Sequence, residues 1–134
     1  MREIKCRGYN KELQKWIIGS YVDGYIINGV MESNEEYIVI ERWAPVEKGS
    51  IGQYTGLKDK NGVEIYEGDI IHTEGQYPGI GWYDTGEHDY NFNGVVTWEQ
   101  EDLAFKCEGY YLNELDCIKV IGNIFENEEL LKEV

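Results

Sequence analysis

The sequence predicts a mainly β protein: an all-β barrel or sandwich, most simply a small barrel-like fold of SH3-like or related type with a short C-terminal helix. Two observations support this. The apolar runs are short, rich in Ile, Val and aromatic residues, and separated by Gly or Asn, as in strands joined by turns. The best helix candidate lies close to the C-terminus, where an N-cap residue precedes an acidic first turn.

The predicted strands follow one another along the whole chain. They cover residues 3–9, 16–22, 25–28, 37–42, 64–66, 69–74, 93–99, 104–107 and 118–124. The segment from Gly75 to Asn93 is the longest one without a convincing strand pattern. We therefore expect a long loop there, and long loops are often functional or disordered.

The predicted helix begins after Asn127, whose side chain suits an N-cap. Glu128 and Glu129 would lie in its first turn, at the positive end of the helix dipole. Leu130 and Leu131, followed by Val134, would form its apolar stripe. A helix of about two turns is stable only when it is docked. Leu130 and Leu131 are therefore candidate contacts with the open end of a barrel or with a neighbouring subunit.

The segment IGQYTGLKDKNGVEIYEGDII, residues 51–71, has a readable hairpin pattern. A strand-like piece over residues 53–57 precedes Asn61-Gly62, a pair typical of the type I′ turn because both residues tolerate positive φ. Residues 63–66 then alternate between apolar and polar, as in a half-buried strand. A second turn over residues 67–69 leads into Ile70-Ile71. We interpret the segment as a structural cassette in which glycine supplies backbone freedom.

This segment resembles the signature of the YopX family, small proteins of unknown function carried by phages and prophages. The opening IKCRGYN with WIIG, and the closing VIGNIFENEELL, are similar to the start and end of family members. The resemblance implies a bacterial host cell and brings no established activity. Family membership does not by itself define a function.

A chain of 134 residues is long enough for one domain, and we expect a single domain over residues 1–134. Two β subdomains sharing an interface, with a boundary near residues 50–60, are the alternative. There is no apolar run of membrane-spanning length and no secretion signal at the start. The cysteines, Cys6, Cys107 and Cys117, lack a C-x-x-C spacing, which favours a reduced cytoplasm over disulfides or a zinc site.

Charge is distributed unevenly along the chain, whose net charge is −14. Residues 1–15 sum to +3, whereas residues 61–105 contain ten acidic residues and no Lys or Arg. An acidic field of this size repels phosphates, so direct nucleic-acid binding is not expected. The simplest interpretation is a solvated acidic face. The alternatives are an inhibitor of a host nucleic-acid-binding protein, and self-association of the basic N-terminal strand with the acidic region of another copy.

One group of residues in the predicted loop could carry chemistry. A histidine among carboxylates can bind a divalent metal or act in acid–base catalysis, but this spacing matches no recognised motif, and a solvated acidic loop is the simpler interpretation. The metal candidates are His88, Asp84, Glu87, Asp89 and, from a neighbouring strand, His72. Trp82 and Tyr83 are the pair most expected to be exposed, and therefore candidate protein contacts.

No other pattern indicates catalysis. The serines lack a nucleophile elbow, and Gly79-Ile80-Gly81 lacks the lysine of a phosphate loop. Aromatic residues lining a groove could bind a basic or proline-rich peptide, but we expect Trp16, Trp43 and Trp98 to be core anchors on strands. The sequence thus predicts a non-enzymatic cytoplasmic protein without a cofactor. It would act through protein–protein contacts, as a homo-oligomer, in phage or prophage life.

Overall fold

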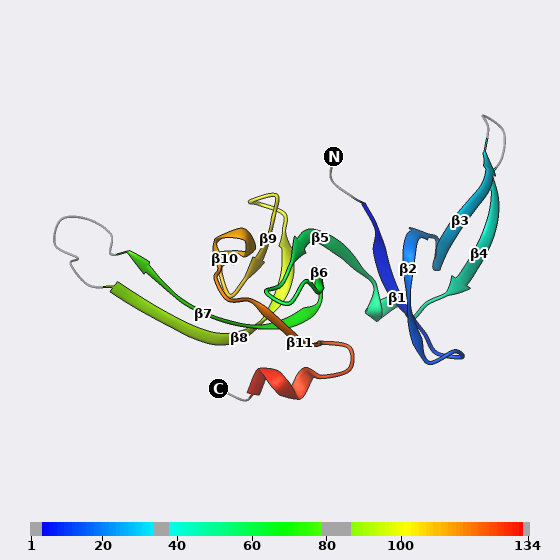
Figure 1. The fold of residues 1–134 in the computed structure, drawn as a ribbon. Helices are drawn as coiled ribbons and strands as arrows, with labels where there is room; N and C mark the ends of the chain where they lie inside the picture. The colour runs from blue at the N-terminus through cyan, green and yellow to red at the C-terminus, as the bar shows by residue number, and fades with distance from the viewer. Residues whose placement is uncertain (1–3, 34–37, 79–86, 133–134) are drawn as a thin grey trace. The chain divides into compact units, whose positions relative to one another are not determined.

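The computed structural model describes residues 4–33, 38–78 and 87–132, which form antiparallel β-strands joined by turns and short 3₁₀ helices (Figure 1). The chain divides into two compact units. Unit 1 is Met1–Gly56 and unit 2 is Leu57–Val134. None of the helical segments among the described residues has the length and apolar character needed to cross a bilayer.

Unit 1 supplies five strands, in the order β4-β3-β2-β1-β5, to a six-stranded antiparallel sheet whose last strand is β6 (Glu64–Tyr66). Its strands are β1 (Cys6–Asn10), β2 (Lys15–Val22), β3 (Tyr25–Ser33), β4 (Ile38–Pro45) and β5 (Gly52–Lys58), and a 3₁₀ turn, η1 (Lys48–Ser50), precedes β5. The last two residues of β5 belong to unit 2. Strands β1 to β4 pair in chain order as successive hairpins, whereas β5 returns to pair with the N-terminal strand β1.

The N-terminal strand β1 lies inside this sheet. It pairs with β2 along its whole length and with β5 at Cys6 and Arg7. Farther along, the carbonyl of Tyr9 accepts a hydrogen bond from the N–H of Glu47 (2.8 Å), and the N–H of Tyr9 donates to Oγ of Ser50 (2.8 Å). The backbone of β1 is therefore satisfied on both sides, and this strand offers no free edge to another chain.

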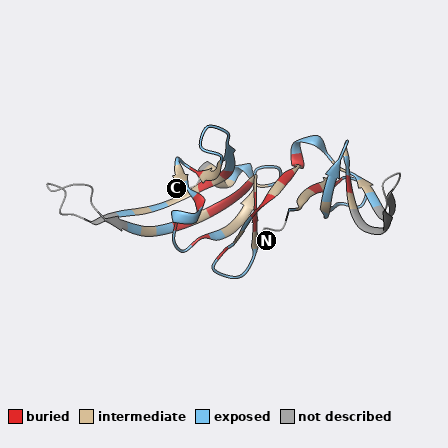
Figure 2. Cartoon of the chain, turned by 90° about the horizontal axis from the view of Figure 1, so that it is seen from above, coloured by how far each residue is buried: buried red, intermediate tan, exposed pale blue. Residues whose placement is uncertain are grey.

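Unit 2 contains a five-stranded antiparallel sheet in the order β10-β9-β8-β7-β11. Its elements are β6 (Glu64–Tyr66), β7 (Asp69–Pro78), β8 (Glu87–Glu99), β9 (Ala104–Cys107), β10 (Tyr110–Tyr111), η2 (Leu112–Glu114), β11 (Lys119–Asn123) and η3 (Glu128–Lys132). The core gathers apolar side chains from β6 to β9 and from the segment before β11 (Figure 2). Its buried members are Ile65, Ile71, Val96, Cys107, Leu112, Leu115 and Ile118.

A two-stranded arm extends from this sheet (Figure 1, drawn in green). β7 and β8 remain paired from Ile70 and Val95 out to Pro78 and Glu87. However, β11 accompanies β7 only over residues 69–72, and β9 accompanies β8 only over residues 96–99. The long loop predicted between Gly75 and Asn93 is therefore wrong for its two flanks, which are strands. Thr73 and Gly75 on one face of β7 and Glu74 and Gln76 on the other supply no apolar side chain, so the alternation that marks a half-buried strand is missing.

The strands themselves were predicted well, but the barrel is wrong. The two sheets are open: among the described strands, β10 and β11 end one sheet without pairing with each other, and β4 and β6 end the other. Periodicity locates strands, whereas closure depends on which strands pair, and a single sequence does not report pairing.

The C-terminal α-helix is also not present, because residues 128–132 form the 3₁₀ helix η3. The N–H of Leu130 donates to the carbonyl of Asn127 (2.9 Å), an i to i+3 bond. The side chain of Asn127 does not cap the turn but turns back, and its Oδ1 accepts from the N–H of Asn123 (3.2 Å). This loop-closing bond competes with the N-cap bond that the sequence suggests.

Candidate functional site

A two-residue hairpin turn in unit 1 sets the geometry of the candidate site. Asp23 and Gly24 both have positive φ, 47° and 92°, as the type I′ turn requires. The turn places Val22 directly opposite Tyr25, and the same register pairs Ile27 with Trp43 on β4. Because side chains two apart on a strand share a face, these four residues lie on one side of the sheet.

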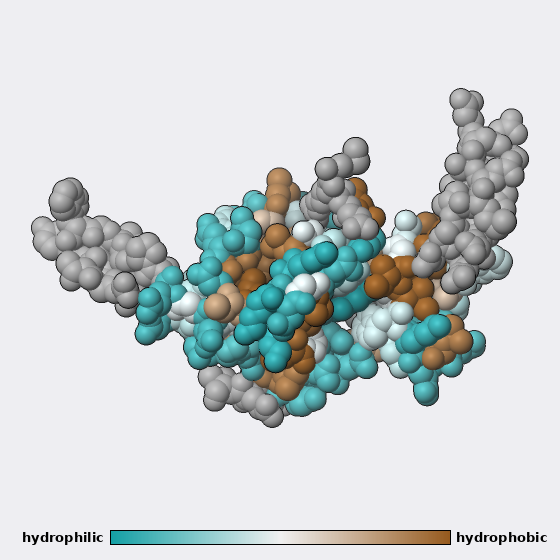
Figure 3. Space-filling model, viewed as in Figure 1, coloured by the Kyte–Doolittle hydropathy of each residue, from teal (hydrophilic) through white to brown (hydrophobic). Residues whose placement is uncertain are grey.

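The apolar face, as we call it, consists of Ile18, Val22, Tyr25, Ile27 and Trp43. Four of its members are largely exposed: Trp43 by 62%, Val22 by 51%, Tyr25 by 45% and Ile18 by 41%. The opposite side of the same strands carries Ile26, which is fully buried. Ile26 is thus buried on one side of the sheet, whereas these apolar side chains are exposed on the other. Figure 3 shows hydrophobic residues, in brown, at the surface of unit 1.

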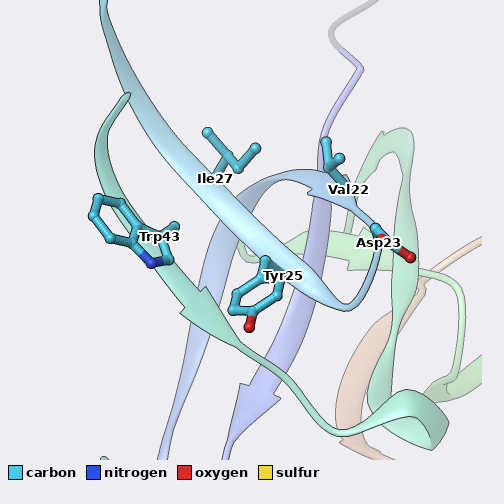
Figure 4. A pocket seen from close by; sticks show the side chains of 5 residues that line it. All are labelled: Val22, Asp23, Tyr25, Ile27 and Trp43. Atoms are coloured by element: carbon cyan, nitrogen blue, oxygen red, sulfur yellow. The ribbon is translucent and has the colours of Figure 1, made fainter. Parts of the chain in front are cut away.

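A shallow hollow of about 500 Å³ lies on the apolar face, between Val22, Asp23, Tyr25, Ile27 and Trp43 (Figure 4). A second hollow of about 420 Å³ adjoins it at Trp43 and is lined in part by Trp16 and Ile18. Among the lining residues that the structure describes, Asp23 is the one that carries a charge. Large aromatic rings with little charge around them are typical of protein-contact surfaces.

Two tryptophans that the sequence predicted as core anchors are at the surface. Trp43 is exposed on the apolar face, and Trp98 on β8 is 38% exposed, with its ring edge-to-face against Phe105 at 5.0 Å. Trp16 is half-buried and packs edge-to-face on Tyr9 at 5.4 Å. The core-anchor prediction is therefore wrong for Trp43 and Trp98. The Asp-Gly pair was the available signal, because a two-residue turn fixes which side chains lie opposite each other.

Two basic side chains near the N-terminus make contacts within unit 1. The Arg7 guanidinium lies 4.8 Å from the centre of the Trp16 ring, and the Lys5 ammonium lies 4.9 Å from that of Tyr54. Such cation–π contacts hold a cation against an aromatic face. These two cations are therefore engaged locally.

Charge divides sharply between the two units. Unit 1 contains seven Lys or Arg and eight Asp or Glu, a net charge of −1, whereas unit 2 contains five and eighteen, a net charge of −13. Nearly all of the acidic excess thus belongs to unit 2, and the apolar face belongs to a unit that is almost neutral.

The predicted metal residues are not brought together where the structure describes them. His72 lies opposite Asn93 on β8, and its Nδ1 donates to Oδ1 of Asn93 (2.8 Å). His88 is opposite Tyr77, five positions farther along β8, which is about 17 Å at 3.4 Å per residue. This separation of the two backbones is too large for both imidazoles to bind one ion.

Two of the three carboxylate residues predicted as metal ligands lie on the described part of β8. Asp89 is exposed on the arm, opposite Gln76, and Glu87 pairs with Pro78 through the backbone. Asp84 lies outside the described residues. Within residues 4–33, 38–78 and 87–132, no group of three or more His, Cys, Asp or Glu is placed to hold a metal ion.

The predicted protein contacts are placed only in part. Trp82 and Tyr83 lie outside the described residues. Leu130 and Leu131 are half-buried on η3. The carbonyl of Leu130 accepts a hydrogen bond from Nδ2 of Asn93 (3.2 Å), which ties η3 to β8 of the same unit.

Comparison with known proteins identifies the lineage of the chain. The family model described as YopX protein matches residues 5–132, nearly the whole length. The chain belongs to the YopX family. Among solved structures, the YopX chain is similar to the crystal structure of protein EF1440 from Enterococcus faecalis. The two share 27% sequence identity with a TM-score of 0.59, over 98% of this chain and 99% of that one. No curated protein matches it.

Proposed function

We propose that this YopX protein acts through protein–protein contacts, as a homo-oligomer, and not by catalysing a reaction. The apolar face of unit 1 carries the proposal. An isolated exposed apolar residue needs no explanation, but contiguous apolar side chains around a hollow mark an interaction surface. Their exposure on a sheet whose other side holds a buried core means that folding of unit 1 leaves them available.

The cellular setting is part of the same proposal. The resemblance to phage and prophage proteins supports the proposal that this protein acts in the cytoplasm of a bacterial host. There it would contact another copy of itself, or a phage or host protein, during the phage or prophage life cycle. Direct contact with nucleic acid or a membrane is not proposed, because the acidic excess of unit 2 repels phosphates.

Size-exclusion chromatography with light scattering tests the homo-oligomer directly. The full chain would be measured at micromolar concentration, at about 50 mM and about 1 M salt. A defined oligomer at either salt concentration supports the proposal. A monomer under both conditions, over a tenfold range of protein concentration, would overturn it.

A second candidate function follows from the charge division. Unit 2, with a net charge of −13, could occupy the basic surface of a host nucleic-acid-binding protein. Such binding would weaken steeply with salt and would compete with nucleic acid. A competition assay between this protein and DNA for a basic DNA-binding protein tests it, and failure to displace DNA at low salt excludes it for that partner.

The metal-assisted enzyme that the His88 segment suggested stays a prediction. Among the described residues, only the backbone of β7 and β8 and the side chains of His72 and Asp89 bear on it, and they do not converge. No observation in the structure favours it over the contact function.

A further inference from the structure

The proposed homo-oligomer leaves open where the copies meet, and the following inference rests on that proposal. We infer that two copies meet through the apolar face of unit 1, packed against the same face of the partner. The contact is isologous: Trp43 and Tyr25 of each copy lie against the hollow of the other.

Charge is the first argument for a second copy as the occupant. Each unit 1 has a net charge of −1, so two of them approach with little repulsion, whereas two copies of unit 2 bring −13 against −13. Among the described residues that line its hollow, Asp23 is the one that carries a charge. An isologous contact centred on Trp43 therefore avoids the acidic surface that dominates the chain.

Area is the second argument. The four exposed apolar residues of the face expose on the order of 400 Å² per copy, if a whole aromatic side chain presents about 150–250 Å². Two copies therefore supply about 800 Å² of largely apolar surface. A standard interface of about 1,600 Å² is roughly 57% apolar, or about 900 Å². The face thus matches the apolar part of one such interface.

The competing geometry, a basic N-terminal strand paired with the acidic region of another copy, fits the structure less well. β1 is satisfied on both sides by β2, β5 and the segment around η1, so it has no edge to offer. Arg7 and Lys5 are engaged on aromatic rings of their own unit. The apolar face has neither restriction.

The experiment compares the full chain with Trp43→Ser and Tyr25→Ser by light scattering and sedimentation over a concentration series. Leu103→Ser is the matched control, since Leu103 is 68% exposed on a turn of unit 2 and is not a member of the face. We expect the Trp43→Ser and Tyr25→Ser variants to raise the dissociation constant at least about thirtyfold, because a central Trp or Tyr is a typical hot spot. The control should assemble like the wild type. Circular dichroism and thermal unfolding of each variant verify that unit 1 still folds.

Salt separates the two geometries. An apolar contact persists in about 1 M salt, and assembly strengthens there as the repulsion between the two acidic units is screened. A contact made by opposite charges weakens instead. Assembly that is lost at high salt would overturn the apolar contact and favour the charge-driven one.

The failures of the two proposals can be told apart. If the wild type assembles and both variants assemble equally well, the apolar face is not the contact between copies, and the homo-oligomer proposal is unaffected. If the wild type is a monomer at every salt and concentration, both are wrong. A monomer whose tryptophan fluorescence changes on addition of a proline-rich peptide containing lysine would assign the face to a peptide partner, again overturning the second copy.

Discussion

The carboxylate of Asp59 joins the signature hairpin of unit 2 to its last strand, and its removal is a direct test of how this unit is held together. Oδ1 accepts the backbone N–H groups of Asn61 and Val63, both at 2.9 Å, and Oδ2 accepts that of Val120 on β11 at 3.0 Å. Asp59 itself is buried, with 7% exposure. One side chain thus closes a turn and anchors a strand 61 residues away.

Asp59→Asn keeps the shape and removes one acceptor. Its amide nitrogen would face one of the three N–H donors, and the bonds that remain would lose their charge. A hydrogen bond to a charged group contributes about 1.5–3 kcal/mol and a neutral one about 1 kcal/mol. The three changes together predict a loss of about 3 kcal/mol. For a unit of this size, that loss lowers the melting temperature by roughly 12–24 °C.

The effect has a defined pH dependence. Burial alone would raise the pKa of the Asp59 carboxyl, but its three backbone N–H donors and the nearby Lys60 outweigh burial and hold the pKa below its ordinary value of 3.8. A carboxylate with a lowered pKa stabilises the fold fully above the unfolded value, and this contribution is lost as the pH falls through the folded value. The difference between wild type and Asp59→Asn should therefore be constant above about pH 5 and shrink below about pH 3.8.

Urea unfolding of the full chain, followed by circular dichroism between pH 3 and pH 7, measures this difference. Glu101→Gln is the control, because Glu101 is an exposed carboxylate on a turn of the same unit. The control should change the free energy of unfolding by less than about 0.5 kcal/mol. An Asp59→Asn variant as stable as Glu101→Gln at pH 7 would refute the role assigned to these hydrogen bonds.

Two further predictions concern unit 2. Burial raises the pKa of the Cys107 thiol to about 12, so a thiol reagent at pH 8 should modify exposed Cys117 and half-buried Cys6 first, and Cys107 only on unfolding. A fast phase that survives the double substitution Cys6→Ser and Cys117→Ser would contradict this. Tyr90→Phe should cost about 1 kcal/mol, because the Tyr90 hydroxyl accepts the N–H of Asp116 (2.8 Å). Gly75→Ala places a Cβ 2.5 Å from the oxygen of the same hydroxyl. Gly75→Ala should therefore lower the free energy of unfolding less in the Tyr90→Phe variant than in the wild type, as measured by unfolding of the single and double variants. Equal losses in the two backgrounds would exclude a clash with the hydroxyl.

The sequence was sufficient for the strands and for the lineage. Glu64–Tyr66 and Ala104–Cys107 have the predicted bounds, and the other predicted strands differ at one or both ends. The hairpin at Asn61-Gly62 is present, but its turn is not type I′. Gly62 has positive φ, and Asn61 is not among the residues that do. The bonds from Gly62 N–H to the Asp59 carbonyl and from Asp59 N–H to the Val63 carbonyl form a three-residue loop instead.

The candidate site could not be predicted, because its residues have the apolar character expected of a buried core. Trp43, Ile27 and Val22 have the composition of a buried strand face, and only the pairing of β2, β3 and β4 shows that Ile26 takes the buried side. Sidedness depends on register, and a shift of one residue exchanges the two faces. The Asp23-Gly24 turn fixes that register, but the sequence was interpreted as having its type I′ turn at the Asn61-Gly62 pair.

The order of strands in each unit has a consequence for how the protein is made. All five strands of the unit 1 sheet have been synthesised by residue 58, and each hairpin can close as it leaves the ribosome. In unit 2, β7 must wait for β11, and the Asp59 carboxylate must wait for Val120. Unit 1 can therefore fold during translation, while unit 2 completes its sheet only after residue 123 has emerged. Through that interval, the nascent chain presents a finished apolar face beside an unfinished acidic unit.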